Sequence, residues 1–205
     1  MSVVCPYFSI DLVSRVYLKP HQLDNNLKYN ILSNIRRDRE NKCCKHGYII
    51  KVHDDNDIDS NISIVNDMNG LVRPEDMQCT AEFMVRFSAN MCMPIENTQI
   101  VVKIDRLQQV LLFASNGPIK VLIQLDDINH EKFELTNERI FYKDTETFVE
   151  EDEFVIVQIM AQKFYTGDNE IKTIGRLIDR ATQSDKDLSY RLLDVKHTQT
   201  YKRYF

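Results

Sequence analysis

The strongest candidates for metal chemistry are Cys43, Cys44 and His46, because thiolates and imidazoles are the usual protein ligands of zinc. A structural zinc site needs four ligands, commonly in paired Cys-x-x-Cys motifs, and the sequence contains no such pair. Cys79 would have to approach from a distant part of the chain. We therefore interpret these residues as loop thiols with one buried cysteine, and we expect no metal and no other cofactor.

A second metal-like pattern is the run Asp55, Asp57 and Asp59, which imitates the opening of an EF-hand calcium loop. That loop requires glycine at its sixth position and a bidentate glutamate at its twelfth, where this chain has Ser60 and Asn66. We expect a solvated turn here.

Motifs for catalysis are missing from the sequence. The carboxylates of residues 150–153 form a charge run, which is usually a solvated face. Their spacing does not identify a second acid that could act with one of them in catalysis. The sequence has no Gly-x-Ser-x-Gly, no phosphate-binding glycine loop and no His-Glu-x-x-His. We expect that the chain is not an enzyme.

Hydrophobic periodicity in the first region predicts a sheet with one helix. Alternating apolar residues predict strands from Phe8 to Val13 and from Thr80 to Ser88, and Gly47 opens another strand. Apolar residues spaced by four predict an amphipathic helix near residues 22–40. Its stripe consists of Leu23, Leu27, Ile31 and Ile35.

After Met93 the pattern changes to short strands and turns, which favour a Greek-key barrel of the OB-fold type. The predicted strands are Gln99–Ile104, Gln108–Ala114, Pro118–Gln124, Phe154–Lys163 and Glu170–Leu177. Residues 116–118 and 166–169 are predicted to be hairpin turns. Between the third and fourth strands, residues 126–152 form a long acidic insertion.

These elements predict an α+β fold. Residues 1–88 are expected to form a small antiparallel sheet with one packed helix, and residues 89–183 a five-stranded OB-fold barrel. Residues 184–205 form a mildly basic C-terminal extension with Leu188, Leu192 and Val195 at helical spacing. A helix this short is not stable alone, and we therefore expect the extension to lie on this chain or on a partner.

Composition sets limits on partners and location. The net charge is -5, and no region is strongly basic, whereas a general nucleic-acid-binding domain neutralises phosphates with Lys and Arg. The five cysteines without Cys-x-x-Cys spacing suit a reducing compartment. Short apolar runs predict no membrane span, and the amino terminus does not resemble a secretory signal.

The barrel nevertheless contains both components of single-strand binding, positive side chains and aromatic rings. The candidate RNA-binding residues are Lys103, Arg106, Lys120, Lys163 and Phe164, with Lys172, Arg176 and Tyr165 beside them. The alternative is that these lysines only balance the carboxylates of an acidic domain for solubility. We expect any contact with RNA to be weak.

The order of elements in residues 8–52 resembles the start of one family. Leu18-Lys19-Pro20 is followed by the amphipathic helix, then by the segment from Lys42 to His46 and by Gly47-Tyr48-Ile49-Ile50. Residues 117–121 (GPIKV) and 171–177 (IKTIGRL) are similar to a hairpin and a final strand of the same family. In these features the chain resembles the stalk subunit of multisubunit DNA-directed RNA polymerases, which is the seventh subunit of the eukaryotic enzymes and has a direct archaeal counterpart.

Two regions depart from this family. Residues 93–97 (MPIEN) stand where the family has a glycine-rich entry to the barrel, and the C-terminal extension has no counterpart. The bias toward Asn, Asp, Ile and Lys, with no Trp, suits an AT-rich genome such as that of a large DNA virus encoding its own polymerase.

The resemblance implies a non-catalytic subunit that acts in transcription. Members insert an amino-terminal tip domain at the base of the polymerase clamp, against the largest and other core subunits, and their barrel projects beside the RNA exit path. For this chain it implies weak contact with nascent RNA and none with membranes. The residues implied in docking on the polymerase core are Lys42, Lys45, His46, Gly47 and Tyr48.

The resemblance leaves some partners and locations open. Most members pair with a helical stalk subunit, which some viral enzymes lack. The implied location is the site of transcription, which is the nucleus or, for a viral protein, the cytoplasmic viral factory and the virion. Two other functions are also open: a free-standing OB-fold RNA-binding or translation factor, and a structural adaptor of another assembly.

Overall fold

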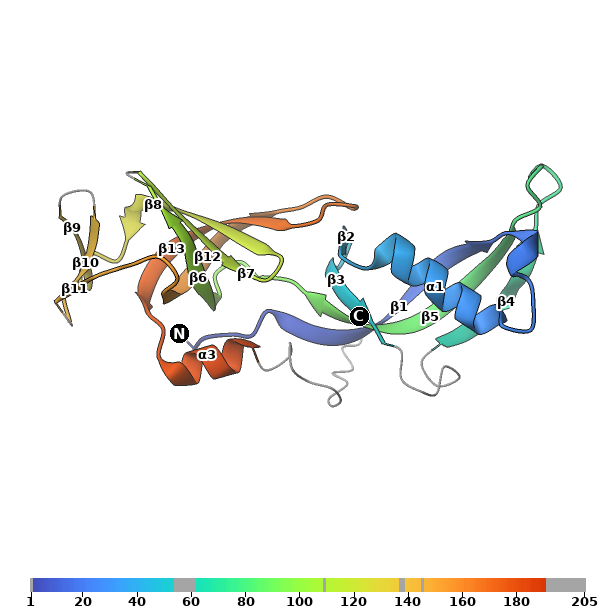
Figure 1. The fold of residues 1–205 in the computed structure, drawn as a ribbon, viewed down its shortest axis with the longest axis horizontal. Coiled ribbons are helices and arrows are strands. Elements are labelled where there is room, and N and C mark those ends of the chain that lie inside the picture. Colours follow the sequence, from blue (N-terminus) through green and yellow to red (C-terminus); the bar gives the residue numbers. More distant parts are fainter. Residues whose placement is uncertain (1, 54–61, 109, 137–138, 145, 191–205) are drawn as a thin grey trace. The chain divides into compact units, whose positions relative to one another are not determined.

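The computed structural model describes residues 2–53, 62–108, 110–136, 139–144 and 146–190 (Figure 1). The chain divides into two compact units. Among the described residues, one unit contains Phe8–Met91, and the other combines the first seven residues with the chain from Cys92 to Tyr190. Within the described residues, no helix has the length and apolar character needed to cross a membrane.

The first unit is a five-stranded sheet with one helix, α1 (Leu27–Arg39), on one of its faces (Figure 1). The strands are β1 (Tyr7–Leu18), β2 (Lys42–Cys44), β3 (Gly47–Val52), β4 (Ile62–Val72) and β5 (Ala81–Cys92). Their order is β1-β5-β3-β2, and β4 also pairs with β5. The α+β architecture predicted for this region is confirmed.

The core of this unit lies between α1 and the sheet. Its buried residues include Ile31, Leu32, Ile35, Val16, Leu18, Val85 and Phe87. On β1, Leu18 is fully buried whereas its neighbour Tyr17 is 55% exposed, as expected when one sheet face is covered. The helix therefore covers the face formed by the alternate apolar residues that the sequence singled out.

Helix α1 begins later than the sequence predicted, because polar groups hold a turn before it. A 3-10 turn occupies Pro20–Gln22, and the backbone N–H of Asn26 donates to Asp24 Oδ1 (2.9 Å). Such side-chain bonds to nearby backbone compete with helix formation. Leu23, predicted to belong to the helical stripe, therefore lies outside the helix and is 45% exposed.

The second unit is a closed barrel of five strands. They are β6 (Gln99–Leu107), β7 (Leu111–Asn116), β8 (Ile119–Ile128), β12 (Phe154–Lys163) and β13 (Ile171–Arg180). β6, β7 and β8 are joined as antiparallel neighbours, β13 is parallel to β8, and β12 closes the barrel between β13 and β6. This is the Greek-key order of an OB-fold, so the predicted five-stranded OB-fold is confirmed.

The acidic insertion between β8 and β12 contains a separate three-stranded antiparallel sheet. Its strands are β9 (Phe133–Thr136), β10 (Arg139–Tyr142) and β11 (Thr147–Phe148). Phe133 and Ile140 are fully buried and Tyr142 is nearly so, so this small sheet has a core face. Strands this short give too few alternations to be recognised from sequence.

Two ionic clusters fasten the insertion to the end of β13. Asp179 pairs with Lys132 and accepts a hydrogen bond from the hydroxyl of Tyr142 (2.9 Å). Arg180 binds Glu153 through its guanidinium, with Nη2 to Oε1 at 2.5 Å. Burial favours the neutral form of Asp179, but the hydrogen bonds from Lys132 and Tyr142 prevail and hold the pKa of this carboxyl below its ordinary value.

The lowered pKa of Asp179 predicts a pH-dependent contribution to stability. A carboxyl whose pKa is lowered by folding stabilises the fold above its unfolded pKa of about 4, and this contribution is lost as pH falls below that value. We expect Asp179→Asn to cost about 1–3 kcal/mol near pH 7 and less near pH 3, measured by urea unfolding. An equal cost at both pH values would contradict this prediction.

The first residues of the chain are part of the barrel unit. The N–H of Val4 donates to the carbonyl of Gln99 (2.8 Å), at the start of β6. Tyr7 is 3% exposed, and its hydroxyl donates to Oδ1 of the buried Asn116 (2.7 Å), at the end of β7. The barrel thus includes residues that precede the first unit in the sequence.

Helix α3 (Gln183–Tyr190) follows β13 and lies beside the start of β12, where the ammonium of Lys186 is 4.6 Å from the ring centre of Phe154. The predicted stripe of Leu188, Leu192 and Val195 cannot be assessed. The side chain of Leu188 and all of residues 191–205 lie outside the described residues.

Candidate functional site

The residues implied in core docking lie in the hairpin of β2 and β3. Cys44 pairs with Gly47, so Lys45 and His46 form a two-residue turn, and both side chains are exposed. Lys42 belongs to β2 and not to the turn, and its ammonium donates to a backbone carbonyl of α1 (3.3 Å). We call Lys45 and His46 the hairpin tip.

The other two implied residues support this hairpin from within. Gly47 has φ of +126°, a conformation that strains residues with a Cβ, and it is buried. Tyr48 is 9% exposed and pairs with the buried Cys43. Only the hairpin tip, within the implied set, therefore presents exposed side chains at the turn.

The metal candidates of the sequence are not brought together in the described part of the chain. Cys43 is buried, Cys44 is partly buried and Cys79 is exposed. No group of three or more His, Cys, Asp or Glu residues able to hold a metal ion occurs among the described residues. Asp55, Asp57 and Asp59 lie outside them.

Strand register places several basic residues in one transverse row on the outer surface of the barrel. Residues directly opposite each other on paired strands point to the same face. The row contains Lys103 of β6, Ser115 of β7, Lys120 of β8, Lys172 of β13 and Lys163 of β12, each the partner of the next. We call it the basic row. The basic row thus brings Lys172 together with Lys103, Lys120 and Lys163, which are three of the candidate RNA-binding residues.

Nearby carboxylates neutralise most of the basic row. Lys120 lies 3.3 Å from Asp105, and Lys103 lies 2.7 Å from Asp152. The third pair, between Lys172 and Glu170, is 3.5 Å. Lys163 instead has its ammonium 5.5 Å from the centre of the Tyr165 ring. Exposed ion pairs such as these are weak, so a phosphate can compete with the carboxylates for the lysines. The net gain in binding free energy is smaller than for unpaired lysines.

An apolar row runs beside the basic row and was missed by the sequence reasoning. Phe113 of β7 pairs with Leu122 of β8, which pairs with Ile174 of β13. Phe113 is 37% exposed and Ile174 is 48% exposed. Strict alternation within the predicted strand, between the buried Leu112 and Ala114, could have placed Phe113 on the outer face.

Two further RNA candidates lie at the borders of these rows. Arg106 of β6 pairs with Phe113 and is exposed, so it extends the apolar row with a positive charge. Phe164 is partly buried, whereas its neighbour Tyr165 is 63% exposed in the hairpin between β12 and β13. Tyr165 and Phe113 are therefore better placed than Phe164 to stack on a base.

Comparison with known proteins identifies one relative that spans both units. The chain is 29% identical over 179 residues to a protein of Acanthamoeba polyphaga mimivirus named "Putative DNA-directed RNA polymerase subunit". The alignment covers 87% of this chain and 85% of that protein. No protein-family model matches the chain. Together with the resemblance already visible in its motifs, this makes the chain a homologue of a viral protein named as a DNA-directed RNA polymerase subunit.

Proposed function

We propose that this chain is a non-catalytic stalk subunit of a DNA-directed RNA polymerase, which docks on the polymerase core and guides nascent RNA during transcription. The main support is the similarity to the mimivirus protein, because the aligned region includes residues of both the sheet unit and the barrel. The site of action is where the polymerase transcribes: the nucleus, or the viral factory and virion for a viral enzyme.

In this role the β2–β3 hairpin contacts the largest subunit and its neighbours at the base of the clamp. Main-chain pairing holds the hairpin, and the positive φ of Gly47 closes its turn. Only Lys45 and His46 project there, so binding needs little ordering of the chain on association. An ammonium and an imidazole fit an acidic pocket on the core.

The barrel contributes a second, weaker contact with single-stranded RNA. The basic row supplies phosphate contacts and the apolar row supplies a stacking surface, the combination on which such binding rests. Since Lys103, Lys120 and Lys172 already pair with carboxylates, few phosphates are neutralised on binding. Affinity for free RNA is therefore low and depends only modestly on salt.

Phe113→Ala is expected to weaken binding of an oligouridine of about 12 nucleotides roughly fivefold or more, because a stacked base contributes about 1–3 kcal/mol. Fluorescence anisotropy at several salt concentrations is the measurement. Phe148→Ala is the matched control, since Phe148 is similarly exposed (42%) but lies on the insertion. A sub-micromolar affinity at about 150 mM salt, or equal effects of both variants, would contradict the proposed weak site on the apolar row.

Affinity purification of the full chain from its native source, followed by mass identification, tests the function as a whole. A stalk subunit brings polymerase core subunits with it, and a helical stalk partner if the enzyme has one. The alternative, a free-standing OB-fold RNA-binding or translation factor, predicts RNA or ribosomal proteins without polymerase subunits. Recovery of neither the largest polymerase subunit nor any other core subunit would contradict the proposal.

A further inference from the structure

The outer face of the small sheet in the insertion carries two adjacent aromatic rings. Register pairs Glu134 of β9 with Phe141 of β10, and Phe141 with Phe148 of β11, so these three side chains point to one face. The ring centres of Phe141 and Phe148 lie 5.4 Å apart in an edge-to-face arrangement. We call Phe141 and Phe148 the aromatic pair.

The aromatic pair lies on the face that the core of the insertion does not use. Phe133 and Tyr142 pair with each other on the opposite face, where both are buried. Phe148, in contrast, is 42% exposed, and Phe141 is partly buried. Contact between the two rings stabilises the short strand β11 but leaves apolar ring surface in contact with solvent. That surface is available to a partner.

The insertion that carries these rings is strongly acidic. Residues 126–152 contain ten Asp or Glu and three Lys or Arg, a net charge of -7 against -5 for the whole chain. Three exposed carboxylates adjoin the aromatic pair. Glu134 shares its row, Glu146 comes directly before β11, and Glu150 follows β11 by two residues.

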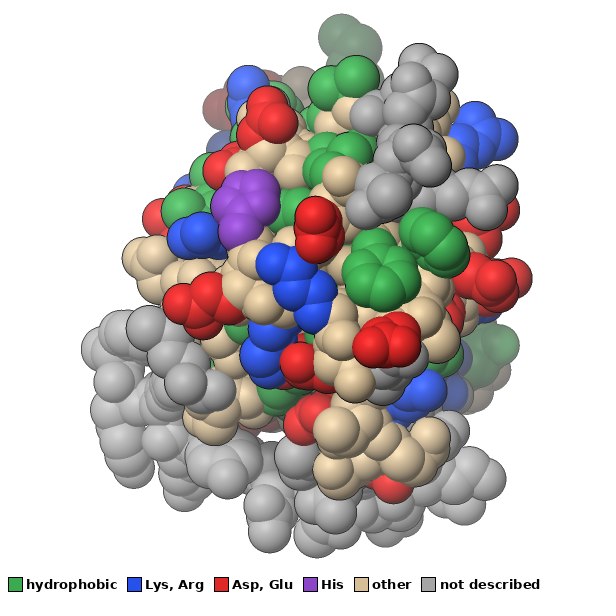
Figure 2. Space-filling model, turned by 90° about the vertical axis from the view of Figure 1, so that its left-hand side faces the viewer, with side chains coloured by type: hydrophobic (Ala, Val, Ile, Leu, Met, Phe, Trp, Pro, Cys, Tyr) green, Lys and Arg blue, Asp and Glu red, His purple; other side chains and the backbone are tan. Residues whose placement is uncertain are grey.

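Basic side chains of the insertion do not cancel this charge. Lys132 pairs with Asp179 of β13, and Lys143 donates to the carbonyl of His130 (2.9 Å). Figure 2 views the molecule from the side where the insertion lies in Figure 1, and hydrophobic, acidic and basic side chains share that surface. Because the net charge of the insertion is negative, it repels phosphates and attracts cations, so its ligand is not RNA.

Hydrogen bonds from the barrel hold the aromatic pair in place. Arg180 of β13 donates to the hydroxyl of Thr147 (2.7 Å) and to the carbonyl of Phe148 (3.4 Å), which are the two residues of β11. The same guanidinium binds Glu153, just before β12. Since the surface is ordered before a partner arrives, binding there costs little conformational entropy of this chain.

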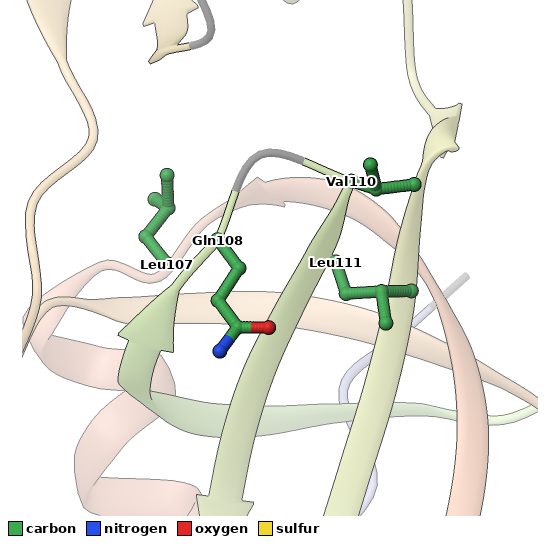
Figure 3. Close-up of a pocket in the computed structure, with 4 residues that line it drawn as sticks. All are labelled: Leu107, Gln108, Val110 and Leu111. Atoms are coloured by element: carbon green, nitrogen blue, oxygen red, sulfur yellow. The ribbon is translucent and has the colours of Figure 1, made fainter.

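A second apolar surface of the barrel unit is an open hollow where β6 turns into β7. Its volume is about 510 Å³, and the described residues that line it are Leu107, Gln108, Val110 and Leu111 (Figure 3). Figure 3 shows Leu107 and Gln108 on one side of it, with Val110 and Leu111 on the other. The hollow offers aliphatic side chains and one amide but no aromatic ring. Val110, which is 68% exposed, is therefore a suitable comparison position for the aromatic pair.

We propose that the aromatic pair and the carboxylates around it form a docking surface for a basic segment of another protein. Lys and Arg side chains of that segment pair with Glu134, Glu146 and Glu150, and one of its aromatic or aliphatic side chains packs on the exposed ring of Phe148. Charge steers the encounter, and the ring supplies the apolar anchor. The surface lies wholly within the barrel unit, so this inference does not rest on docking to a polymerase.

The probe for this surface is a fluorescently labelled synthetic peptide in which Lys and Phe alternate, and anisotropy with the full chain measures its binding. Phe148→Ala should weaken binding roughly tenfold or more, because aromatic anchors carry most of the affinity of such contacts. Raising the salt from roughly 50 to 500 mM should also weaken it. A peptide in which Ser replaces Phe should bind roughly tenfold more weakly, because it has no apolar anchor.

Phe113→Ala and Val110→Ala are the matched controls for the lost ring. Both remove exposed apolar side chains, one from the apolar row and one from the hollow, and both variants should bind the peptide as the unchanged chain does. Phe113→Ala should weaken binding of oligouridine only, and Phe148→Ala binding of the basic peptide only.

Charge reversal covers the case that Phe148→Ala disturbs the small sheet. Glu146→Lys with Glu150→Lys leaves both rings in place and should weaken binding of the peptide. Glu75→Lys with Glu96→Lys reverses as many exposed carboxylates outside the insertion and should weaken binding much less.

Four results would overturn the proposal. The first is an equal effect of Phe148→Ala and Phe113→Ala, and the second is equal binding of the Lys-Phe and Lys-Ser peptides. Loss of binding in Val110→Ala but not in Phe148→Ala would place the peptide in the hollow. Self-association of the chain that Phe148→Ala abolishes, measured by analytical ultracentrifugation, would assign the surface to a second copy.

Discussion

Tyr7→Phe should destabilise the barrel by about 1–3 kcal/mol, although the substitution removes only one oxygen near the amino terminus. The hydroxyl of Tyr7 donates to Oδ1 of Asn116 (2.7 Å) and also lies 3.1 Å from its carbonyl oxygen. Both residues are almost fully buried. Asn116 in turn donates from Nδ2 to the carbonyl of Val101 (2.7 Å), so the lost donor belongs to a buried network.

The hydroxyl of Tyr7 lies directly against the turn between β7 and β8. Gly117 has φ of +59°, and a Cβ placed there would lie 2.5 Å from the hydroxyl oxygen of Tyr7. The ring therefore packs directly against the β7–β8 turn, and Tyr7→Ala should cost more, about 3–5 kcal/mol, by opening a cavity. Differential scanning calorimetry of the full chain measures both effects, at about 4 °C per kcal/mol for a unit of slightly more than about 100 residues.

Hydrogen exchange resolved along the chain should locate this loss. Faster exchange is expected in β7 and β8, which flank the Tyr7 contact, and less change in α1. Tyr29→Phe is the matched control, because Tyr29 is 61% exposed on the helix and should tolerate the change. A melting temperature of Tyr7→Phe equal to that of Tyr29→Phe would show that the amino-terminal segment is not a structural part of the barrel.

Local patterns predicted the elements whose packing is local. The strand Phe154–Lys163 was predicted at its observed limits because its alternation and its flanking turns agree. The predicted hairpin at residues 116–118 was also found, since Asn116 pairs with Ile119 and Gly117 adopts the positive φ that such turns favour. For a long strand that is bounded by turn residues, hydrophobic periodicity is enough to predict where the strand begins and ends.

Elements decided by distant contacts could not be predicted in this way. The start of α1 depends on the polar contacts of Asp24, which periodicity ignores. The strands of the insertion are too short to show a period, and their stability comes from contacts of Lys132 and Tyr142 with Asp179 on β13. The place of Tyr7 in the barrel depends on Asn116, more than a hundred residues away.

The candidate RNA-binding surfaces also combine features that the sequence predicts locally with features that depend on strand pairing. Register assembles Lys103, Lys120 and Lys163 into one row although they come from three strands, and no spacing along the chain indicates this. Register also determines that Phe113 lies next to Leu122 rather than beside Phe164. Residue types suggested a basic and aromatic surface, whereas its composition depends on which strands are paired.

The proposed docking of the hairpin tip leads to the prediction with the largest expected functional effect. Replacing Lys45 and His46 together by Glu should abolish incorporation of the chain into the polymerase while leaving its fold intact. Both side chains are exposed at the hairpin turn, and the structure gives them no role in the core of the unit. Reversing charge at the centre of an interface costs several kcal/mol, enough to lower binding by more than a hundredfold.

The matched control is Lys19→Glu with His21→Glu. These residues are also an exposed lysine and an exposed histidine of the first unit, so the double variant changes charge equally, but they lie in the turn before α1. Each variant is mixed with polymerase lacking this subunit, and incorporation is measured by gel filtration after its melting temperature has been compared with that of the unchanged chain. Docking through the hairpin tip requires that the control assembles and the tip variant does not. Equal incorporation of the two folded variants would place the docking surface elsewhere on the chain.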